Sequence, residues 1–221
     1  MSTIASSQLS LTSTVGTSSA LSKQSAAANV QSAVSNAAIQ LYTAWLAQSI
    51  KCVLFLPVSK ATSAFPLAAN TAQVLTKLTQ APILLMNIDT PANPIPEFDD
   101  NGRSDEPLRL GEVPVAGSGT GSLFRAELMR DIDPLAFLLS EEFRTFLGKS
   151  RTEFAQSLLY GPALSESAVG LLVAKQVDGC VLVVEEGVSQ YSEIQMAKKQ
   201  LAQTGCNLLG FLYQRNRKAK R

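Results

Sequence analysis

The chain has 221 residues, of which 46% are hydrophobic, and its formal net charge is +1. This length favours one domain with a sizeable core, and the balanced charge argues against nucleic acid as a partner. Histidine is absent, so Ser/His/Asp and Cys/His mechanisms are excluded within the chain and a zinc site is disfavoured.

Neither the cysteines nor the hydropathy pattern points to export or to a membrane span. Cys52, Cys180 and Cys206 lack CxxC spacing and lie in or beside apolar runs, which is typical of small core residues in a reduced protein. No apolar run approaches the roughly 20 residues that cross a bilayer. The first residues show no signal-peptide pattern. We therefore expect a cytoplasmic protein without a resident metal ion.

The N-terminal region divides into two segments of different composition. Residues 1–28 are rich in Ser, Ala and Thr, which predicts a disordered arm because little apolar surface offsets the entropy of ordering. From Asn29 to Ile50, large apolar residues recur at helical spacing without Gly or Pro, which predicts a long amphipathic helix. Its aromatic pair, Tyr42 and Trp45, could pack on the domain or on a partner.

A strand, a loop of small residues and a helix are predicted in the stretch that follows. The apolar run 52–56 predicts a buried strand, and Pro66 suits the first turn of a helix. In nucleotide-binding α/β proteins a glycine-rich loop with a lysine stands at this place. Here the loop 57–65 contains no glycine. A second strand at 83–88 completes a βαβ unit, with Asp89 at its carboxyl edge, where such sheets place ligands.

Residues 90–122 are predicted to form a long insertion on the surface. They contain five of the ten prolines, and loops of this length are usually functional or disordered. One short strand near 113–116 is compatible with the pattern. The run from Gly117 to Ser122 resembles a phosphate loop but lacks the GK[ST] ending, so an anion site and a flexible linker both remain open.

The remaining chain alternates between helical and strand-like segments. Residues 29–214 are therefore predicted to form a single α/β domain, with a mostly parallel central sheet and helices on both faces. A basic tail, 215–221, follows the domain. The predicted segments are helices at 131–147, broken near Ser140, a strand at 157–160, a helix from Ser165 or Ser167 to Ala174, a strand at 180–184, a helix from Ser189 to Gly205 and a strand at 208–213.

Two segments of the C-terminal half resemble a known family. DPLAFLLSEEFRTFL (133–147) is similar to paired helices in the cytoplasmic domain of the bacterial tyrosine autokinases, the BY-kinases. VDGCVLVVEEGVSQYSEIQMAKKQLAQTGCNLLGFLYQR (177–215) is similar to the end of that domain. The family belongs to the P-loop ATPases with the MinD-like proteins and serves capsule and exopolysaccharide export. The resemblance therefore implies a P-loop NTPase-like fold and a role in such a system.

The phosphate-binding residues of this family are missing from the corresponding positions. LAAN (67–70) matches the helix after the family's phosphate loop and fixes the register. Ala64 then stands at the position of the phosphate-binding lysine, while Phe65 and Pro66 replace a Ser/Thr pair. Ala64 removes a charge on the phosphates, Phe65 offers no hydroxyl to Mg²⁺, and Pro66 lacks a backbone donor.

Acidic residues and the tyrosine cluster are altered as well. Asp89 is kept, but Asn87 replaces its acidic partner, and Tyr160 takes the place of the metal-orienting aspartate. Gln214 replaces an asparagine that contacts the nucleotide base, and the C-terminal tyrosines give way to RNRKAKR. Asp89 and Tyr160 are expected to face the loop, with Tyr160 either plugging an empty pocket or serving as a phosphorylation site. The resemblance thus implies a degenerate member with a vestigial site.

We expect a catalytically inactive pseudo-enzyme without a cofactor. It would be a structural or regulatory subunit of bacterial exopolysaccharide biosynthesis and export, held at the inner membrane through a partner. The resemblance implies a polysaccharide copolymerase or a glycosyltransferase as that partner, and self-association stays open. Candidate contacts are Tyr42, Trp45 and the basic residues of the tail, Arg215, Arg217, Lys218, Lys220 and Arg221.

Two alternatives remain open. An atypical nucleotide-binding ATPase or kinase could rebuild its site from Lys60, the only amine in the loop, and Asp89. A peripheral membrane adaptor could use the basic tail, because each basic residue near an anionic surface contributes about 1 kcal/mol before screening.

Overall fold

The computed structural model describes residues 36, 38–89, 107–117, 119–129 and 132–214. The predicted arm 1–28, most of the proline-rich insertion and the tail 215–221 lie outside these residues. Residues 38–47 are helical. The elements that follow are β1 (Cys52–Pro57), α2 (Phe65–Thr79), β2 (Ile83–Asn87), β3 (Leu108–Val113), β4 (Leu123–Leu128), α3 (Pro134–Leu139), α4 (Glu141–Glu153), β5 (Gln156–Tyr160), α5 (Val169–Ala174), β6 (Gly179–Glu185), α6 (Tyr191–Thr204) and β7 (Leu208–Gln214).

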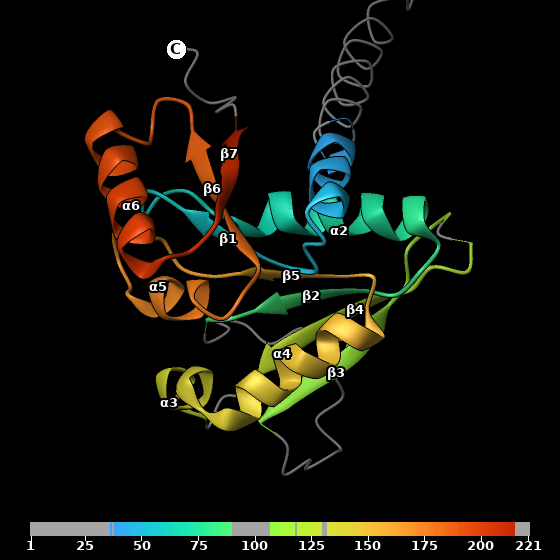
Figure 1. Cartoon of the computed structure of the whole chain (residues 1–221). Helices are drawn as coiled ribbons and strands as arrows, with labels where there is room; N and C mark the ends of the chain where they lie inside the picture. Colours follow the sequence, from blue (N-terminus) through green and yellow to red (C-terminus); the bar gives the residue numbers. More distant parts are fainter. Residues whose placement is uncertain (1–35, 37, 90–106, 118, 130–131, 215–221) are drawn as a thin grey trace, which may run out of the picture.

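These strands form one mixed sheet in the order β3-β4-β2-β5-β1-β6-β7. Every neighbouring pair is parallel except β3 and β4, which are antiparallel. The helices α3, α4, α5 and α6 lie on one face of the sheet, and α2 with the helix at 38–47 lies on the other (Figure 1). The predicted fold class, a mostly parallel α/β sheet with helices on both faces, is therefore confirmed.

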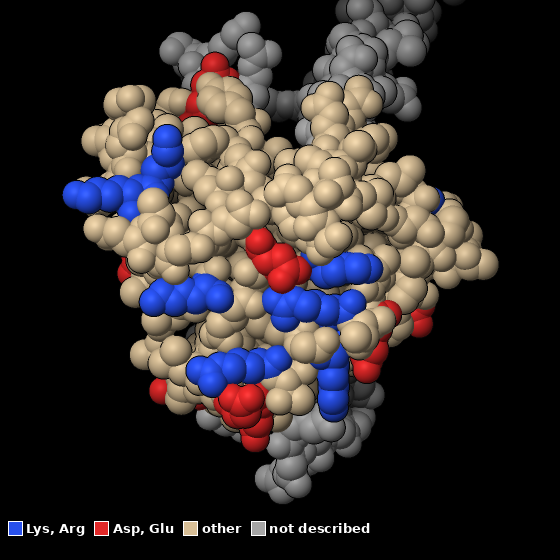
Figure 2. Space-filling view, viewed as in Figure 1, with Lys and Arg blue, Asp and Glu red and all other residues tan. Residues whose placement is uncertain are grey.

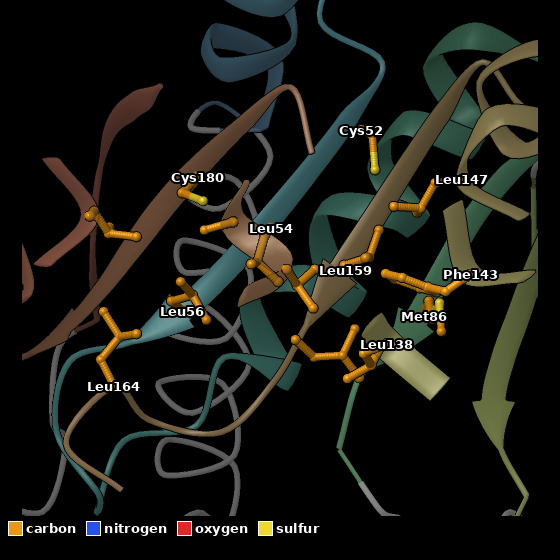
Figure 3. Close-up of a cluster of buried hydrophobic side chains, with 14 of the residues drawn as sticks. Cys52, Leu54, Leu56, Met86, Leu138, Phe143, Leu147, Leu159, Leu164 and Cys180 are labelled. Atoms are coloured by element: carbon orange, nitrogen blue, oxygen red, sulfur yellow. The ribbon is translucent and has the colours of Figure 1, made fainter. Parts of the chain in front are cut away.

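Two apolar cores lie on the two faces of the sheet. Strand side chains alternate between them, so that Cys52, Leu54 and Leu56 join the core under α3–α6, whereas Val53 and Phe55 join the core under α2. All six residues of β1 are buried, as expected for a parallel strand covered on both sides. Figure 3 shows the first core, where leucines of β1 and β5 meet side chains of α3 and α4.

The largest departure from the sequence prediction is a β-hairpin at one edge of the sheet. We expected residues 107–122 to belong to a surface insertion with one strand near 113–116, and we predicted no strand at 123–128. Instead β3 ends at Val113 and pairs with β4, which continues the sheet beside β2. The prediction failed because both strands carry charged side chains, with Arg109 opposite Glu127 in the ladder, rather than a continuous apolar run.

The glycine-rich run Gly117–Ser122 lies in the hairpin connection between β3 and β4, and it docks on the end of α2. The Thr120 N–H donates to Gln80 Oε1 at 3.0 Å. Because β4 runs parallel to β2, its first residue lies beside Ile83 at the amino-terminal edge of the sheet. The described residues of this turn therefore lie at the edge opposite the loop after β1, and its two predicted roles stay predictions.

Two of the predicted helix ends are confirmed and two are wrong, since α5 begins at Val169 after the N-cap Ala168 rather than at Ser165 or Ser167. Ser140 ends α3 and caps α4 through a hydrogen bond from the Phe143 N–H. Gly205 ends α6 with a left-handed φ of 74°, which favours glycine. The predicted cap Ser189 instead accepts from the Glu185 N–H, and α6 is capped by Gln190.

Trp45 is a core residue. It is only 1% exposed, and its ring packs edge-on against Phe55 of β1, with centroids 6.3 Å apart. The predicted use of Trp45 as a partner contact is therefore wrong for this structure, since its surface is already covered. Tyr42, on the same helix, is partly exposed and packs at the margin of the α2 core.

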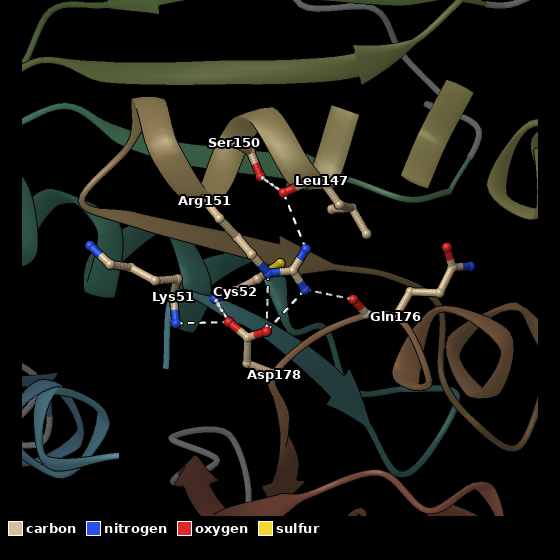
Figure 4. A network of polar contacts seen from close by, with 7 residues as sticks. All are labelled: Lys51, Cys52, Leu147, Ser150, Arg151, Gln176 and Asp178. Atoms are coloured by element: carbon tan, nitrogen blue, oxygen red, sulfur yellow. Dashed lines mark hydrogen bonds and ion pairs between the residues drawn. The ribbon is translucent and has the colours of Figure 1, made fainter. Parts of the chain in front are cut away.

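Asp178 joins three elements at the amino-terminal edge of the sheet (Figure 4). Its Oδ2 accepts from the backbone N–H groups of Lys51 and Cys52, at 2.9 and 2.8 Å. Its Oδ1 pairs with the guanidinium of Arg151 on α4 at 2.9 Å. Arg151 in turn donates to the carbonyls of Leu147 and Gln176. One carboxylate thus fixes the start of β1, the end of α4 and the approach to β6.

We predict that Asp178→Ala lowers the free energy of unfolding by about 3 kcal/mol, because Arg151 and two backbone donors lose their acceptor together. Urea denaturation of the two proteins measures this difference. The control is Glu141→Ala, which removes an exposed ion pair with Arg144 and should cost roughly 0.5 kcal/mol. Equal losses in the two variants would contradict the assignment of Asp178 as a structural centre.

Candidate functional site

The candidate site is the loop between β1 and α2, at the carboxyl edge of the sheet. β1 lies between β5 and β6 in the sheet, and the last residue of β5, Tyr160, pairs in register with Phe55 of β1 and Asn87 of β2. The carboxyl ends of these strands therefore meet beside the loop, and this is the edge at which α/β sheets bind ligands. This register places Tyr160 at the edge of the sheet where the sequence led us to expect it.

The loop backbone does not form a phosphate nest. Among the described residues, the non-glycine residues with a positive φ are Ser49 and Gln80. The loop residues 58–64 contain no glycine and are not among them, so none has a positive φ. A nest that wraps an anion commonly alternates right- and left-handed conformations. Ala64, at the start of α2, offers no capping side chain, and Pro66 lies in the first turn. The helix therefore begins with one backbone donor fewer.

Phe65 and Tyr160 close the site with their rings. Their centroids are 5.2 Å apart and their planes are tilted by 47°. Tyr160 is 8% exposed and Phe65 is 38% exposed, so the contact lies between the core and the surface. Burial raises the pKa of Tyr160, which keeps its hydroxyl neutral. Phe65 and Tyr160, which stand where the BY-kinases have a metal-binding hydroxyl and an aspartate, are therefore in contact with each other.

Arg125 of β4 covers this aromatic pair. Its guanidinium carbon lies 5.1 Å from the centroid of the Phe65 ring, which is a cation–π distance. Its Nη2 lies 3.5 Å from the Tyr160 hydroxyl and 3.3 Å from Glu127 Oε1. The arginine is thus held against Phe65 by a buried carboxylate of its own strand. Sequence analysis missed both Arg125 and Glu127, because β4 was not predicted.

Two carboxylates bind the side chains of the loop. Lys60 Nζ lies 2.7 Å from Glu166 Oε1, and this hydrogen bond raises the pKa of Lys60. Ser59 Oγ donates to Glu193 Oε2 of α6 at 2.5 Å. The same oxygen accepts from the Gln190 N–H, and both hydrogen bonds lower the pKa of Glu193. The loop is thus fastened by acidic groups, of which sequence analysis identified neither.

Two polar residues lie at the carboxyl end of β2: Asn87 is its last residue, and Asp89 follows two positions later. Asp89 is exposed and is separated from the strand by the buried Ile88. Its N–H donates to Asn87 Oδ1 at 3.1 Å, so the Asn87 side chain closes a local turn. Lys60 is 81% exposed and engaged with Glu166. In the described part of the chain, the Lys60 amine is therefore held by Glu166, which a site rewired around Lys60 and Asp89 would have to replace.

Basic side chains gather on the surface formed by α4 and its neighbours (Figure 2). They come from separate segments, which is why the sequence did not show them as one group. Part of this charge is neutralised, because Arg151 pairs with Asp178 and Arg144 with Glu141. Among the described residues, no group of three or more His, Cys, Asp or Glu is placed to hold a metal ion. No helix in the described ranges is long and apolar enough to cross a bilayer.

Comparison with known proteins finds similarity in structure but not in sequence families. No family model matches the chain, and no curated protein matches its sequence. The chain is similar to the BceF tyrosine kinase domain, with a TM-score of 0.67 and 18% identity over 83% of this chain and 76% of that one. It is also similar to the kinase domain of VpsO, with a TM-score of 0.63 and 18% identity over 84% and 96%. The kinase domain of the Escherichia coli tyrosine kinase ETK gives a TM-score of 0.60 and 12% identity over 77% and 70%.

These structures define the fold of the chain as that of the bacterial tyrosine kinase domains. The expectation of a BY-kinase-like P-loop fold is confirmed, and the seven-stranded order agrees with it. Identities of this size establish the fold alone. What the chain does with that fold must come from its own residues at the loop.

We predict that Ser59→Ala raises the pKa of Glu193 toward its ordinary value, because the first of its two hydrogen bonds is lost. A folded-state pKa below the unfolded value stabilises the protein above the unfolded pKa, and this contribution disappears as the pH falls through the folded pKa. Carboxyl ¹³C NMR titration measures the shift. Thr62→Val is the control, since the Thr62 hydroxyl has no partner among the described residues. An unchanged Glu193 pKa in Ser59→Ala would contradict the contact.

Proposed function

We propose that the chain is a catalytically inactive BY-kinase-like protein that acts as a structural or regulatory subunit in bacterial exopolysaccharide biosynthesis and export. The observation that carries the proposal is the contact between Phe65 and Tyr160, whose centroids lie 5.2 Å apart at the carboxyl edge of β5. In phosphoryl transfer the corresponding tasks are metal binding by a hydroxyl and by an aspartate. An aromatic pair can perform neither.

The electrostatics of the loop support the same proposal. P-loop proteins bind phosphates with backbone N–H groups and a lysine, all of them positive or donor groups. Here Glu166 binds Lys60 and Glu193 binds Ser59. An anion at this loop would meet two carboxylates and would have to displace them from their donors. Ala64, which is 1% exposed, contributes no charge in return.

A rewired nucleotide site built from Lys60 and Asp89 has less support. Such a site must break the Lys60–Glu166 ion pair and must also displace Tyr160 or accommodate its ring. Because the ion pair is exposed, it is weak and could be broken. The aromatic pair under Arg125 is the stronger obstacle. The tail 215–221, through which a membrane adaptor would act, lies outside the described residues, so that alternative rests on the sequence alone.

The proposed partner is a polysaccharide copolymerase or a glycosyltransferase of the same system, which would hold the protein at the inner membrane. The support is the likeness in fold to the tyrosine kinase domains of BceF, VpsO and ETK. If the loop binds no nucleotide, the protein must act by binding a partner through its surface. Partly exposed Tyr42 and the basic residues of the tail, including Arg215 and Arg217, are the proposed contacts.

We predict no ATP binding in the presence of Mg²⁺, measured by isothermal titration calorimetry on the full chain. Lys60→Ala is measured beside it. Absence of heat in both proteins agrees with an inactive loop. Micromolar, Mg²⁺-dependent binding to the wild-type chain would overturn the proposal, and loss of that binding in Lys60→Ala would establish the rewired site instead.

We further predict that a polysaccharide copolymerase or a glycosyltransferase copurifies with the tagged chain from membranes of its native host. A chain that ends at residue 214 is the matched comparison, because it lacks only the basic tail. Weaker recovery of the partner with the shortened chain would identify the tail as a contact. Recovery of neither enzyme class with the full chain would contradict the proposed role.

A further inference from the structure

Two cysteines face each other beneath α6. Cys180 is the second residue of β6, and Cys206 lies in the turn between α6 and β7. Their sulfur atoms are 2.8 Å apart, and both residues are free thiols. The backbone holds them in place, because the Cys180 N–H donates to the carbonyl of Asn207, the residue after Cys206, at 2.8 Å. The side chains therefore need only a small movement to approach the S–S bond length of about 2.05 Å.

The two thiols differ in the way that an oxidisable pair requires. Cys206 is partly exposed, whereas Cys180 is fully buried. The hydrogen bond between the two thiols lowers the pKa of Cys206, while that bond and burial raise the pKa of Cys180. Since the thiolate is the reactive species, Cys206 is the sulfur that an oxidant in solution reaches first. The sequence prediction that all three cysteines are buried core residues is thus wrong for Cys206.

We propose that Cys180 and Cys206 form a reversible disulfide in response to hydroperoxides, and that this bond fastens α6 to β6. The Cys206 thiolate attacks the O–O bond of a hydroperoxide, which gives a sulfenic acid and releases the alcohol, or water when the oxidant is hydrogen peroxide. The Cys180 sulfur then attacks the sulfenic sulfur, and water leaves. The two thiols are oxidised to one disulfide, and one peroxide is reduced. A dithiol reductant reverses the reaction.

The position of the pair determines what the disulfide would constrain. The bond would close a loop that contains the whole of α6 (Tyr191–Thr204). The first turn of α6 carries Glu193, which accepts from Ser59 of the loop after β1. The same turn carries Tyr191, whose side chain is 76% exposed, and Met196 in the next turn is 62% exposed. Oxidation would therefore stiffen a helix that contacts the loop and presents apolar side chains to solvent. This inference does not depend on the proposed function.

Cys52 provides an internal control. It is 0% exposed, and burial raises the pKa of its thiol to about 12. It should neither react with peroxide nor exchange with the pair. Trypsin separates the three cysteines into distinct peptides, 52–60, 176–198 and 200–215, so each disulfide has its own mass.

The test treats the reduced full chain with hydrogen peroxide and blocks remaining thiols with a maleimide before peptide mapping without reductant. We expect peptides 176–198 and 200–215 to be joined and the number of free thiols to fall from three to one. The thermal midpoint should rise by about 5–10 °C. Amide hydrogen exchange should slow in α6 but not in α2, and dithiothreitol should restore the starting state.

Three variants make the result specific. Cys206→Ser and Cys180→Ala should abolish the linked peptides, the rise in midpoint and the change in exchange, whereas Cys52→Ala should keep all three. The proposal is overturned if wild-type peroxide treatment leaves three free thiols, links chains to each other, joins peptide 52–60, or oxidises Cys206 to a sulfinic acid without a link. A disulfide that forms without slowing exchange in α6 would overturn the claim that the bond fastens this helix.

Discussion

The ion pair between Asp178 and Arg151 sets the arrangement on which the rest of the fold depends. Three parts of the chain far apart in sequence, the start of β1, the end of α4 and the approach to β6, meet at one carboxylate. Because parallel strands need their starting points aligned, a fixed acceptor for the first N–H groups of β1 determines where that buried strand begins. This polar centre lies at the amino-terminal edge of the sheet. The candidate site lies at the opposite, carboxyl edge of the sheet. The residues of the site are therefore separate from the residues that fix the start of β1.

At the carboxyl edge of the sheet, the loop after β1 lies where P-loop proteins carry their phosphate loop, but here aromatic side chains fill the space beside it. β1 delivers the loop to the ends of β2 and β5, as the bacterial tyrosine kinase domains of similar fold lead one to expect. The residues that arrive there are an aromatic pair under Arg125 and two carboxylates bound to Lys60 and Ser59. Each change has a local physical effect, namely a filled volume, a missing donor or a reversed charge. Together they support our proposal of a protein that acts through its surface rather than through a nucleotide site.

The strands that could be predicted from the sequence are those formed by a continuous run of apolar residues. β1, β2, β5 and β6 are such runs, and α6 ends at a glycine that the left-handed φ explains. The hairpin of β3 and β4 could not be found, because its strands are half exposed and pair charged residues across the ladder. Consequently Arg125 and Glu127 were missed at the site, although Phe65 and Tyr160 were identified. Glu166 and Glu193 were missed for another reason, since nothing local in the sequence marks an acid that reaches a distant loop.

A crystal structure grown with Mg²⁺ and a non-hydrolysable ATP analogue would show directly whether the loop after β1 is closed to nucleotide, as we propose. The structure described here predicts an empty loop in which the rings of Phe65 and Tyr160 remain in contact and Lys60 remains paired with Glu166. Electron density for phosphates along residues 58–65, with Tyr160 displaced from Phe65, would contradict it.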